Sequence, residues 1–293
     1  MSVLTRSPKK RGYLAPRSNT ANLAMILAIG YFLVPIVWVV VNSTKDNTQL
    51  FSTFSLWFPG DWHLIDNVKG LMTQDGGVYL TWMRNTVFYA LASAIGATLI
   101  SSMAGYSLAR FNFRGRAIVE AGILAMVMVP ATALVMPLYL MLSKINLVNT
   151  PWSVILPAML SPFGAFLIRV FVQESIPEEI LQAARIDRAG EFRIYWQIVL
   201  PMLRPALVTV FLFSLVSSWN NFFLPLVMLS ENKYYPLTVG LQSWFDQASQ
   251  EGGNSILFNL VIAGSLIAIV PLIISFIFLQ KYWQGGINAG SIK

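Results

Sequence analysis

The sequence contains very little charge. Of its 293 residues only 11% are charged, 56% are apolar, and the mean hydropathy is +0.62. Soluble domains carry about 25% charged residues, because charged side chains cover the surface that water contacts. So few charges exclude a soluble globular protein, and so much apolar surface excludes a disordered chain. The composition therefore predicts an integral membrane protein.

Residues that several kinds of chemistry require are also missing. The chain has no cysteine, which excludes disulfides and thiolate metal sites, and one histidine, His63, cannot form a zinc site by itself. No G-x-x-x-x-G-K-[ST] motif occurs, so the chain does not cradle ATP phosphates and we expect it to bind no cofactor. Ion-driven carriers need titratable groups near the bilayer midplane, but Glu120 is the only acidic residue within a predicted span. We therefore expect no enzyme, and no transport that this chain drives unaided.

Six apolar segments approach or exceed the roughly 20 residues that cross a bilayer core as a helix. They comprise residues 21–41, 85–108, 117–143, 152–173, 205–229 and 256–280. None shows the period-2 alternation of barrel strands, and a lipid-exposed backbone must satisfy its own hydrogen bonds. The sequence therefore predicts an all-α membrane protein with six transmembrane helices.

The distribution of basic residues predicts the orientation of these helices. With six spans, fifteen of the twenty lysines and arginines fall on the side that holds both termini, and five fall on the other side. Because lysine and arginine concentrate on the cytoplasmic side, we expect both termini in the cytoplasm. The net charge of +7 is thus a signal of topology, which we favour over nucleic-acid binding.

The chain divides into five regions on this topology. Residues 1–20 form a cytoplasmic tail, 21–41 the first transmembrane helix, 42–81 an extracytoplasmic loop, 82–281 a core of five transmembrane helices, and 282–293 a second cytoplasmic tail. The aspartates and aromatic residues of 42–84 indicate a folded extracytoplasmic cap, with a poorly ordered linker as the alternative. Residues 42–84 and 231–251 are candidate docking surfaces for an extracytoplasmic partner.

The most informative segment is the cytoplasmic loop 174–204. Ser175 and Glu178 have the spacing of a capping box, with Pro177 in the first turn, so we expect a helix from about residue 177 to 189. Gly190 is the expected stop, and a second helical stretch follows toward Pro201. The 3.6-residue period places four residues on one shallow face, namely Ile180, Ala183, Ala184 and Asp187. This face indicates docking to a cytoplasmic partner, with a plain amphipathic surface helix as the alternative.

The same loop resembles the "EAA" signature of binding-protein-dependent ABC importer permeases. Ala183-Ala184 and Ile198-Val-Leu-Pro201 fit the spacing of that signature, and the run Ala184 to Asp187 resembles the maltose-permease-like carbohydrate branch. Two positions depart from the pattern: Gln182 stands where a glutamate is usual, and Arg188 stands where a glycine is usual. Further similarity extends over residues 105–116, 219–238 and 280–290, so the resemblance covers about residues 82–293.

The resemblance implies the type I permease fold, the partners and the site residues. It implies a bacterial inner-membrane, multi-pass permease that pairs with a second permease as a heterodimer, with two ATP-binding subunits that bind ATP and Mg, and with an extracytoplasmic solute-binding protein. The loop would couple to the ATPase through eight residues, which are Glu178, Glu179, Ile180, Gln182, Ala183, Ala184, Asp187 and Gly190. The substrate would be a sugar or oligosaccharide, whose identity the sequence does not give.

A polar and aromatic group interrupts the apolar segment 205–229. Ser218, Trp219, Asn220 and Asn221 are expected near its middle, where amides can bind sugar hydroxyls and an indole can cover a sugar ring. Hydrogen bonding between helices explains the same residues equally well. A second pattern, small residues at positions 93, 97, 101 and 105, indicates close helix packing, within the chain or against a paired permease.

Two other classes of function remain as alternatives. An ion-coupled carrier or channel subunit would contain buried ionisable residues and would lack a docking helix for a partner. A structural or assembly subunit would span the membrane without forming a pathway.

Overall fold

The computed structural model describes residues 19–251 and 255–289, and within these ranges the chain forms helices with no β-strand. The long helices are α1 (Asn19–Ser43), α4 (Val78–Arg110), α8 (Pro162–Ser175), α12 (Arg204–Trp219), α14 (Leu237–Glu251) and α15 (Leu257–Ala289). Shorter helices are α2 (Asn47–Ser52), α3 (Leu64–Thr73), α5 (Arg116–Met128), α6 (Val135–Lys144), α7 (Trp152–Ala158), α9 (Glu178–Ile186), α10 (Glu191–Ile194), α11 (Leu200–Met202) and α13 (Phe223–Met228). The five basic residues expected in the first tail, and Lys293 in the second, lie outside the described residues.

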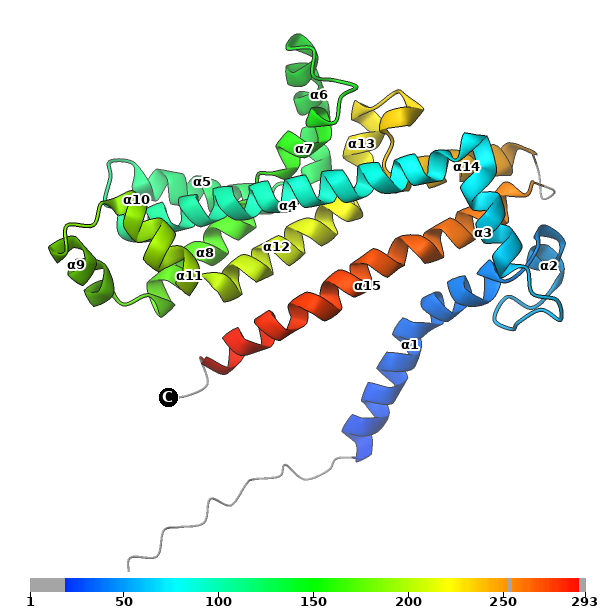
Figure 1. Ribbon diagram of the computed structural model, residues 1–293, viewed down its shortest axis with the longest axis horizontal. Helices are drawn as coiled ribbons and strands as arrows, with labels where there is room; N and C mark the ends of the chain where they lie inside the picture. The colour runs from blue at the N-terminus through cyan, green and yellow to red at the C-terminus, as the bar shows by residue number, and fades with distance from the viewer. Residues whose placement is uncertain (1–18, 252–254, 290–293) are drawn as a thin grey trace, which may run out of the picture.

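Four helices, α4, α8, α12 and α15, form the body of the molecule, and α4 runs along its long axis (Figure 1). The packing of α4 against α8 is close because small residues face each other. A Cβ atom at Gly105 would lie 2.7 Å from Ile168, and one at Gly164 would lie 2.7 Å from the Ser101 hydroxyl. The small residues at positions 93, 97, 101 and 105 therefore pack within this chain, so this stripe is not a surface for a paired permease.

The two ends of the body carry different elements (Figure 1). Helices α9, α10 and α11 lie at one end, together with the beginning of α5, and we call this the α9 end. Helices α2, α3 and α14 lie at the opposite end, which we call the α14 end. The segment expected as a cap, 42–84, is folded here, because it contains α2, α3 and a 3₁₀ turn at Gln74–Gly76.

Four segments are long and apolar enough to cross a membrane. They are Asn19–Ser43, Val78–Arg110, Trp152–Ser175 and Leu257–Lys281. Two further helix pairs meet the same criterion only if each bent pair counts as one span. The structure thus supports between four and six spans.

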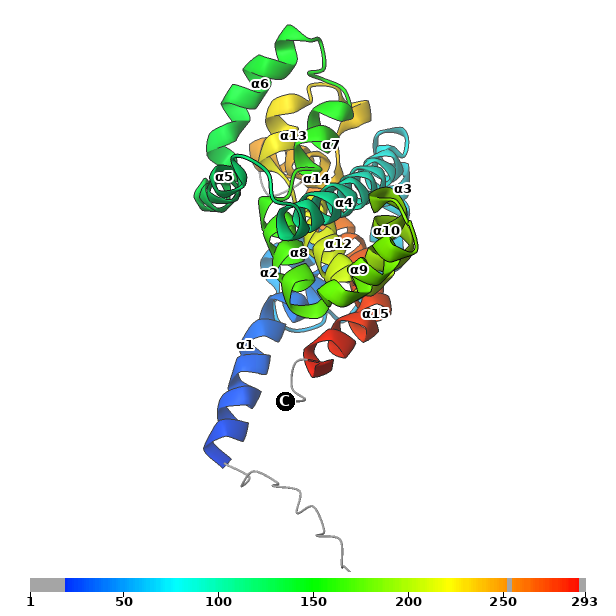
Figure 2. The same cartoon turned by 90° about the vertical axis from the view of Figure 1, so that its left-hand side faces the viewer.

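The segment expected as a span at 117–143 is strongly bent. The chain bends by 104° between α5 and the segment Ala131–Lys144, and Pro130 lies at the break. Pro130 lacks an amide hydrogen and restricts the residue before it, so the helix ends at this point. Figure 2 shows α5 beside the body and α6 projecting away from it. Met128, Met136 and Met141 are more than half exposed on these two arms.

The expected span 205–229 is also broken. Helix α12 ends at Trp219, and α13 begins only at Phe223. Helix α12 (Arg204–Trp219) is also bent by 79° relative to the preceding segment Glu191–Met202. Consequently Ser218 and Trp219 lie at the end of a helix, not near the middle of one.

The α14 end is held by hydrogen bonds from buried side chains to the backbone. Asn67, which is 5% exposed, donates to the carbonyl oxygens of Ser43 (2.9 Å) and Lys45 (2.8 Å) and accepts from Asn259 (3.2 Å). The Tyr79 hydroxyl donates to the carbonyl oxygen of Gly264 at 2.8 Å. These bonds join the end of α1, α3, α4 and α15 into one unit.

Two tryptophans fix α14 onto α4. The rings of Trp82 and Trp244 lie 4.7 Å apart between centroids, and both side chains are buried. Gly240 makes this possible, because a Cβ atom there would lie 2.2 Å from the Trp82 ring. The α14 segment is therefore a packed part of the fold.

Candidate functional site

Helix α9 is separated from α8 by only two residues, and its beginning differs from the expected capping box. Ser175 is the last residue of α8, and Pro177 precedes α9 without a side-chain cap. Ser175 therefore does not cap α9, and the Glu178 carboxylate makes ion pairs with arginines instead. Pro177 still sets the start, because its fixed φ suits the position before a helix.

Helix α9 ends at Ile186, three residues before the expected end, in a Schellman motif. The Ala189 amide donates to Ala184 and the Arg188 amide to Arg185, both at 3.0 Å. Arg188 takes the left-handed conformation, with φ at 58°, where glycine is usual because it has no Cβ. Gly190 has φ at −70° and ψ at 155°, so it does not supply the turn as expected. The departure from the family pattern at Arg188 thus places an arginine in a glycine conformation.

The buried face of α9 does not coincide with the face that the sequence period predicted. Leu181 (0% exposed) and Ala184 (8%) pack into a buried cluster with Ile176, Ile194 and Val199. Of the expected face, Ala184 is buried, whereas Ile180, Ala183 and Asp187 are exposed. The other expected coupling residues are placed as follows: Glu179, Gln182 and Gly190 are exposed, and Glu178 is partly buried.

The outward surface of this loop carries large apolar side chains. Ile186 is 81% exposed and Phe192 is 73% exposed, and Ile180 and Trp196 are also exposed. Singly exposed apolar residues are ordinary, but several in one short loop mark an interaction surface. We call Ile180, Ile186, Phe192 and Trp196 the apolar face of the loop.

Arg110, the last residue of α4, connects α9 to the body. Its guanidinium donates to the Glu178 carboxylate at 2.9 Å, and to the carbonyl oxygens of Val172 (2.9 Å) and Ile176. The side chain is only 13% exposed, so water screens these charge-assisted bonds less than surface pairs. This role of Arg110 has no signal in the sequence, because Arg110 and Glu178 lie 68 positions apart.

Arg185 extends the same network along the loop. It donates to Glu178 at 3.2 Å and to Glu191 at 2.8 Å. These bonds, chiefly the one with Glu191, raise the pKa of Arg185 above its usual value. Glu191 also accepts from the Tyr106 hydroxyl of α4 at 3.4 Å. The loop is thus attached to α4 at both Glu178 and Glu191.

Glu120, the acidic residue within a predicted span, is fully paired. Its two carboxylate oxygens accept from Arg116 (2.8 Å) and from two nitrogens of Arg169 (3.1 Å each). These bonds connect α5 to α8 near the α9 end. Glu120 thus acts in a structural ion pair between helices.

The residues expected in a substrate pathway lie at the end of α12 and do not form one polar group. Trp219 is 7% exposed and packs on Ala90, Ala94 and Leu215. Asn220 is exposed, and its amide donates back to the carbonyl oxygen of Val216 at 2.9 Å. Ser218 lies 3.5 Å from the carbonyl oxygen of Tyr89, and the Asn221 carbonyl accepts from Thr238 at 2.8 Å.

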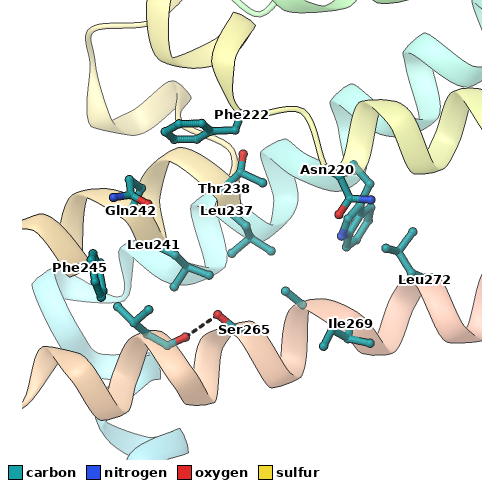
Figure 3. A pocket seen from close by; sticks show the side chains of 13 residues that line it. Asn220, Phe222, Leu237, Thr238, Leu241, Gln242, Phe245, Ser265, Ile269 and Leu272 are labelled. Atoms are coloured by element: carbon teal, nitrogen blue, oxygen red, sulfur yellow. Dashed lines mark hydrogen bonds between the residues drawn. The ribbon is translucent and has the colours of Figure 1, made fainter. Parts of the chain in front are cut away.

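Trp219 and Asn220 line an open groove of about 500 Å³ between α12, α14 and α15 (Figure 3). Phe222, Thr238, Gln242 and Ser265 line it as well, so aromatic surface and neutral polar groups face the same space. None of the thirteen described residues that line the groove is charged. The groove can therefore offer hydrogen bonds and ring stacking, but no ion pair.

Helices α14 and α15 contribute residues to this groove that were not predicted from the sequence. Thr238 and Gln242 are spaced four apart on α14, which places them on one helix face. That spacing is a signal in the sequence, but the segment 231–251 was interpreted as an extracytoplasmic surface. In the part of the chain that the structure describes, no cluster of acidic residues and histidine could hold a metal ion.

Comparison with known proteins decides the family. The family model described as "Binding-protein-dependent transport system inner membrane component" matches residues 97–287. The chain belongs to this family. It is therefore the membrane-spanning permease component of an ABC importer, and the alternative of an ion-coupled carrier or channel is rejected. The permease itself is not an enzyme.

The curated relatives of this permease match over nearly its whole length. An arabinooligosaccharide transport system permease protein of Halalkalibacterium halodurans is 33% identical over 94% of this chain and 99% of its own. A permease protein of the same description from Bacillus subtilis is 32% identical over 92% of this chain. A maltodextrin transport system permease protein of Streptococcus pneumoniae is 30% identical over 94% of this chain.

A solved structure shares the permease fold. A chain from a bacterial ABC transporter involved in the import of the acidic polysaccharide alginate matches with a TM-score of 0.76 and 22% identity. The match covers 93% of this chain and 100% of that chain. The ABC importer permease fold inferred from the sequence resemblance is thus confirmed, and the protein is a multi-pass membrane protein.

Proposed function

We propose that this permease imports a neutral sugar or oligosaccharide and forms half of a pathway driven by partner ATPases. The relatives transport arabinooligosaccharides and maltodextrins by their descriptions, which supports a carbohydrate substrate. The single observation that carries the mechanism is the attachment of an exposed loop helix, α9, to a transmembrane helix, α4, through Arg110. An outside subunit that moves α9 would move α4 with it.

The apolar face of the loop supports ATPase docking. Ile186 and Phe192 expose large apolar surfaces, and contact with a partner would remove these surfaces from water. The exposed residues Glu179, Gln182, Ala183 and Asp187 lie next to this face and complete the proposed contact. When ATP closes two nucleotide-binding subunits, α9 moves with them, and nucleotide binding favours one permease state over the other. ATP and Mg belong to those subunits.

Replacement of the apolar face tests this docking. We expect Ile186→Asp to prevent copurification of the ATPase and to abolish ATP-dependent uptake in vesicles that contain the partner proteins. Ile186→Leu is the matched control, since it keeps an apolar side chain, and it should behave as the wild type. Normal copurification and uptake in Ile186→Asp would rule out docking through this face.

The groove supports a neutral substrate. Phe245, which is 44% exposed, supplies an aromatic surface, and Asn220, Thr238 and Gln242 supply neutral hydrogen-bonding groups for sugar hydroxyls. An anionic sugar would leave its carboxylate or phosphate without a cationic partner among the described lining residues. The proposal therefore sets this permease apart from an importer of acidic polysaccharides with the same fold.

Variants in the groove test the substrate assignment. We expect Gln242→Ala and Asn220→Ala to lower uptake severalfold while ATPase copurification is unchanged. In competition assays, neutral oligosaccharides should inhibit uptake, and uronates or sugar phosphates should not. Unchanged uptake in both variants would leave these side chains with a packing role only.

The proposed assembly includes a second permease as heterodimer partner and an extracytoplasmic solute-binding protein. The exposed apolar surfaces of α1, α5 and α6 support contact with lipid and with a second permease, since they are uncovered in the described chain. We further propose six spans in the bacterial inner membrane, with the α9 end and both termini in the cytoplasm. Reporter fusions after residue 188 should therefore behave as cytoplasmic, and fusions after residue 230 as external.

A further inference from the structure

An exposed aromatic segment lies beyond the end of α1. Residues 51–62 hold five aromatic side chains, which are Phe51 (59% exposed), Phe54 (72%), Trp57 (75%), Phe58 (43%) and Trp62 (61%). Phe58 and Trp62 stack on each other with ring centroids 5.1 Å apart. So much aromatic surface in twelve residues needs an explanation, because exposed apolar patches mark interaction sites.

Hydrogen bonds hold this segment at the level where α1 ends. The Asn42 amide donates to the carbonyl oxygen of Ser55 at 2.8 Å, and the Lys45 ammonium donates to that of Phe54 at 2.9 Å. The His63 amide, next to Trp62, donates to the carbonyl oxygen of Thr44 at 2.8 Å. Residues 54, 55 and 63 are therefore fixed to residues 42–45, directly after the apolar span Asn19–Ser43.

The segment is fixed before any partner arrives. Asp46 and Gln49 form a reciprocal capping box at the start of α2, and Lys45 and Asn42 are fully buried beneath the segment. A surface whose backbone is already ordered loses little conformational entropy when its side chains are covered. The rings of Phe54 and Trp57 are therefore exposed on an ordered backbone and available for contact with a partner.

The charges around the segment point to lipid more than to a charged protein surface. Between residues 46 and 66 there are three aspartates and one histidine, and there is no lysine or arginine. Anionic headgroups would gain nothing from this surface, but tryptophan and other aromatic rings are favoured at membrane–water interfaces regardless of lipid charge. Their depth, level with the end of a span, is the depth of such an interface.

We propose that the aromatic segment 51–62 inserts into the membrane–water interface at the α14 end and anchors the end of α1, with lipid as its partner. This assigns the aromatic residues of the segment to the bilayer and not to docking of the solute-binding protein. The assignment does not depend on which sugar the permease transports.

The absence of cysteine allows a direct test in the assembled importer. A nitroxide label on Trp57→Cys or Phe54→Cys reports depth through its collisions with oxygen, which concentrates in lipid, and with a nickel chelate, which stays in water. The complex is placed in nanodiscs of phosphatidylethanolamine and phosphatidylglycerol, with partner subunits that carry no accessible cysteine. Both positions are highly exposed side chains, so the substitutions remove no packing.

Two further labelled positions define the scale. Phe32→Cys, in the middle of α1 and 72% exposed, is the lipid reference, and Ser230→Cys, in an exposed loop, is the water reference. We expect the oxygen-to-nickel collision ratio at positions 54 and 57 to lie between the references and severalfold above that of Ser230→Cys. A ratio equal to that of Ser230→Cys would overturn the proposal.

Addition of the solute-binding protein separates the two possible partners. The ratio at position 57 should not change when that protein is added, because lipid already covers the segment. Loss of collisions with both reagents, with or without added binding protein, would mean that protein covers the segment and would overturn the proposal.

A measurement without labels gives an independent check. Brominated lipids should quench less of the total fluorescence after the double substitution Trp57→Phe and Trp62→Phe. Trp244→Phe is the control, because Trp244 is 2% exposed and should not be quenched by lipid. An unchanged quenched fraction in the double variant would contradict insertion.

Discussion

The two ends of the helix body are held together by different kinds of interaction. At the α9 end, Arg110 and Arg185 pair with Glu178 and Glu191, and these carboxylates are about 40% exposed. At the α14 end, Asn67 bonds to backbone groups and Trp82 packs on Trp244, and these side chains are buried. Salt partly screens these ion pairs, more at Arg185 (37% exposed) than at Arg110 (13%), whereas it does not screen buried neutral hydrogen bonds.

This difference matches the tasks that the two ends would have in an importer. An end that receives a partner ATPase gains from contacts whose strength changes when the partner's charges approach. The opposite end gains from a fixed arrangement, because it anchors α1, α3, α14 and α15 relative to α4. Substitutions that weaken one end at a time test this difference.

The largest effect is expected from Arg110→Ala. The substitution removes three hydrogen bonds and leaves Glu178 with Arg185 alone, which costs about 2–3 kcal/mol of loop stability, since bonds to charged groups are among the strongest. We expect ATP-dependent uptake to fall by about 10-fold or more, with the ATPase still copurifying.

The control for this variant is Arg110→Lys. Lysine keeps the charge but lacks the planar fork that reaches several acceptors, so it should restore only part of the activity. Wild-type uptake in Arg110→Ala would show that Arg110 does not link α9 to α4.

A smaller effect is expected from Asn67→Leu at the opposite end. It removes two donated bonds and one accepted bond at a buried position, and we expect a loss of about 2 kcal/mol in the free energy of unfolding. Thermal unfolding in nanodiscs measures it, and the loss should be the same at low and high salt. Asn112→Leu, at an exposed position, should change little. Strong salt dependence of the Asn67→Leu effect would contradict the contrast between the two ends.

Arg188→Gly should stabilise the loop. A residue with a Cβ in the left-handed conformation costs roughly 1 kcal/mol relative to glycine, and Arg188 has φ at 58°. We expect slower amide hydrogen exchange in α9, with a gain of about 1 kcal/mol. Gly190→Ala should be close to neutral, because its φ is ordinary and nothing lies within 4 Å of a Cβ there. A neutral Arg188→Gly together with a destabilising Gly190→Ala would show that Gly190, and not Arg188, forms the turn.

The smallest effect concerns an exposed pair at the α14 end. Hydrogen bonds from Lys233 and then Asn149 hold the pKa of the Glu231 carboxyl below its usual value. Between the lowered pKa and the usual one, the unfolded chain therefore binds more protons at Glu231 than the folded chain does. Glu231 thus adds stability at a pH above its usual pKa, and this stability is lost as the pH falls through the lowered pKa. Unfolding of Glu231→Gln and wild type should differ slightly at neutral pH and converge in acid. A difference that grows in acid would contradict this sign.

The sequence predicted the membrane class, the loop helix and the family, because each depends on local residues. Apolar length identified four segments that can each cross a membrane, and the positions of Ala183 and Pro201 identified the loop. Pro130 indicates a break in the helix, but the 104° size of the bend was not predictable, because the residues after it, 131–143, are as apolar as a continuing helix would be. The conformation of Arg188 was missed for a similar reason, since glycine at 190 offered an easier turn.

The site was less predictable than the fold because its parts are distant in sequence. Of the four residues predicted for a substrate pathway, Trp219 and Asn220 line the groove, and their role there stays a prediction. Ser265 comes from another helix, and no local pattern connects it with Asn220. The same holds for Arg110 and Glu178, whose pairing depends on how α4 and α8 pack.

Helix α4 joins the two contrasting ends without interruption. It contains no proline and spans 33 residues, or about 50 Å at the rise of an α-helix. Arg110 is its last residue, and Trp82 lies in its first two turns. The helix is therefore a continuous rod that is fixed to other elements near both of its ends. A movement of Arg110 would therefore be transmitted along α4 to Trp82, whereas the 104° bend after α5 would absorb such a movement.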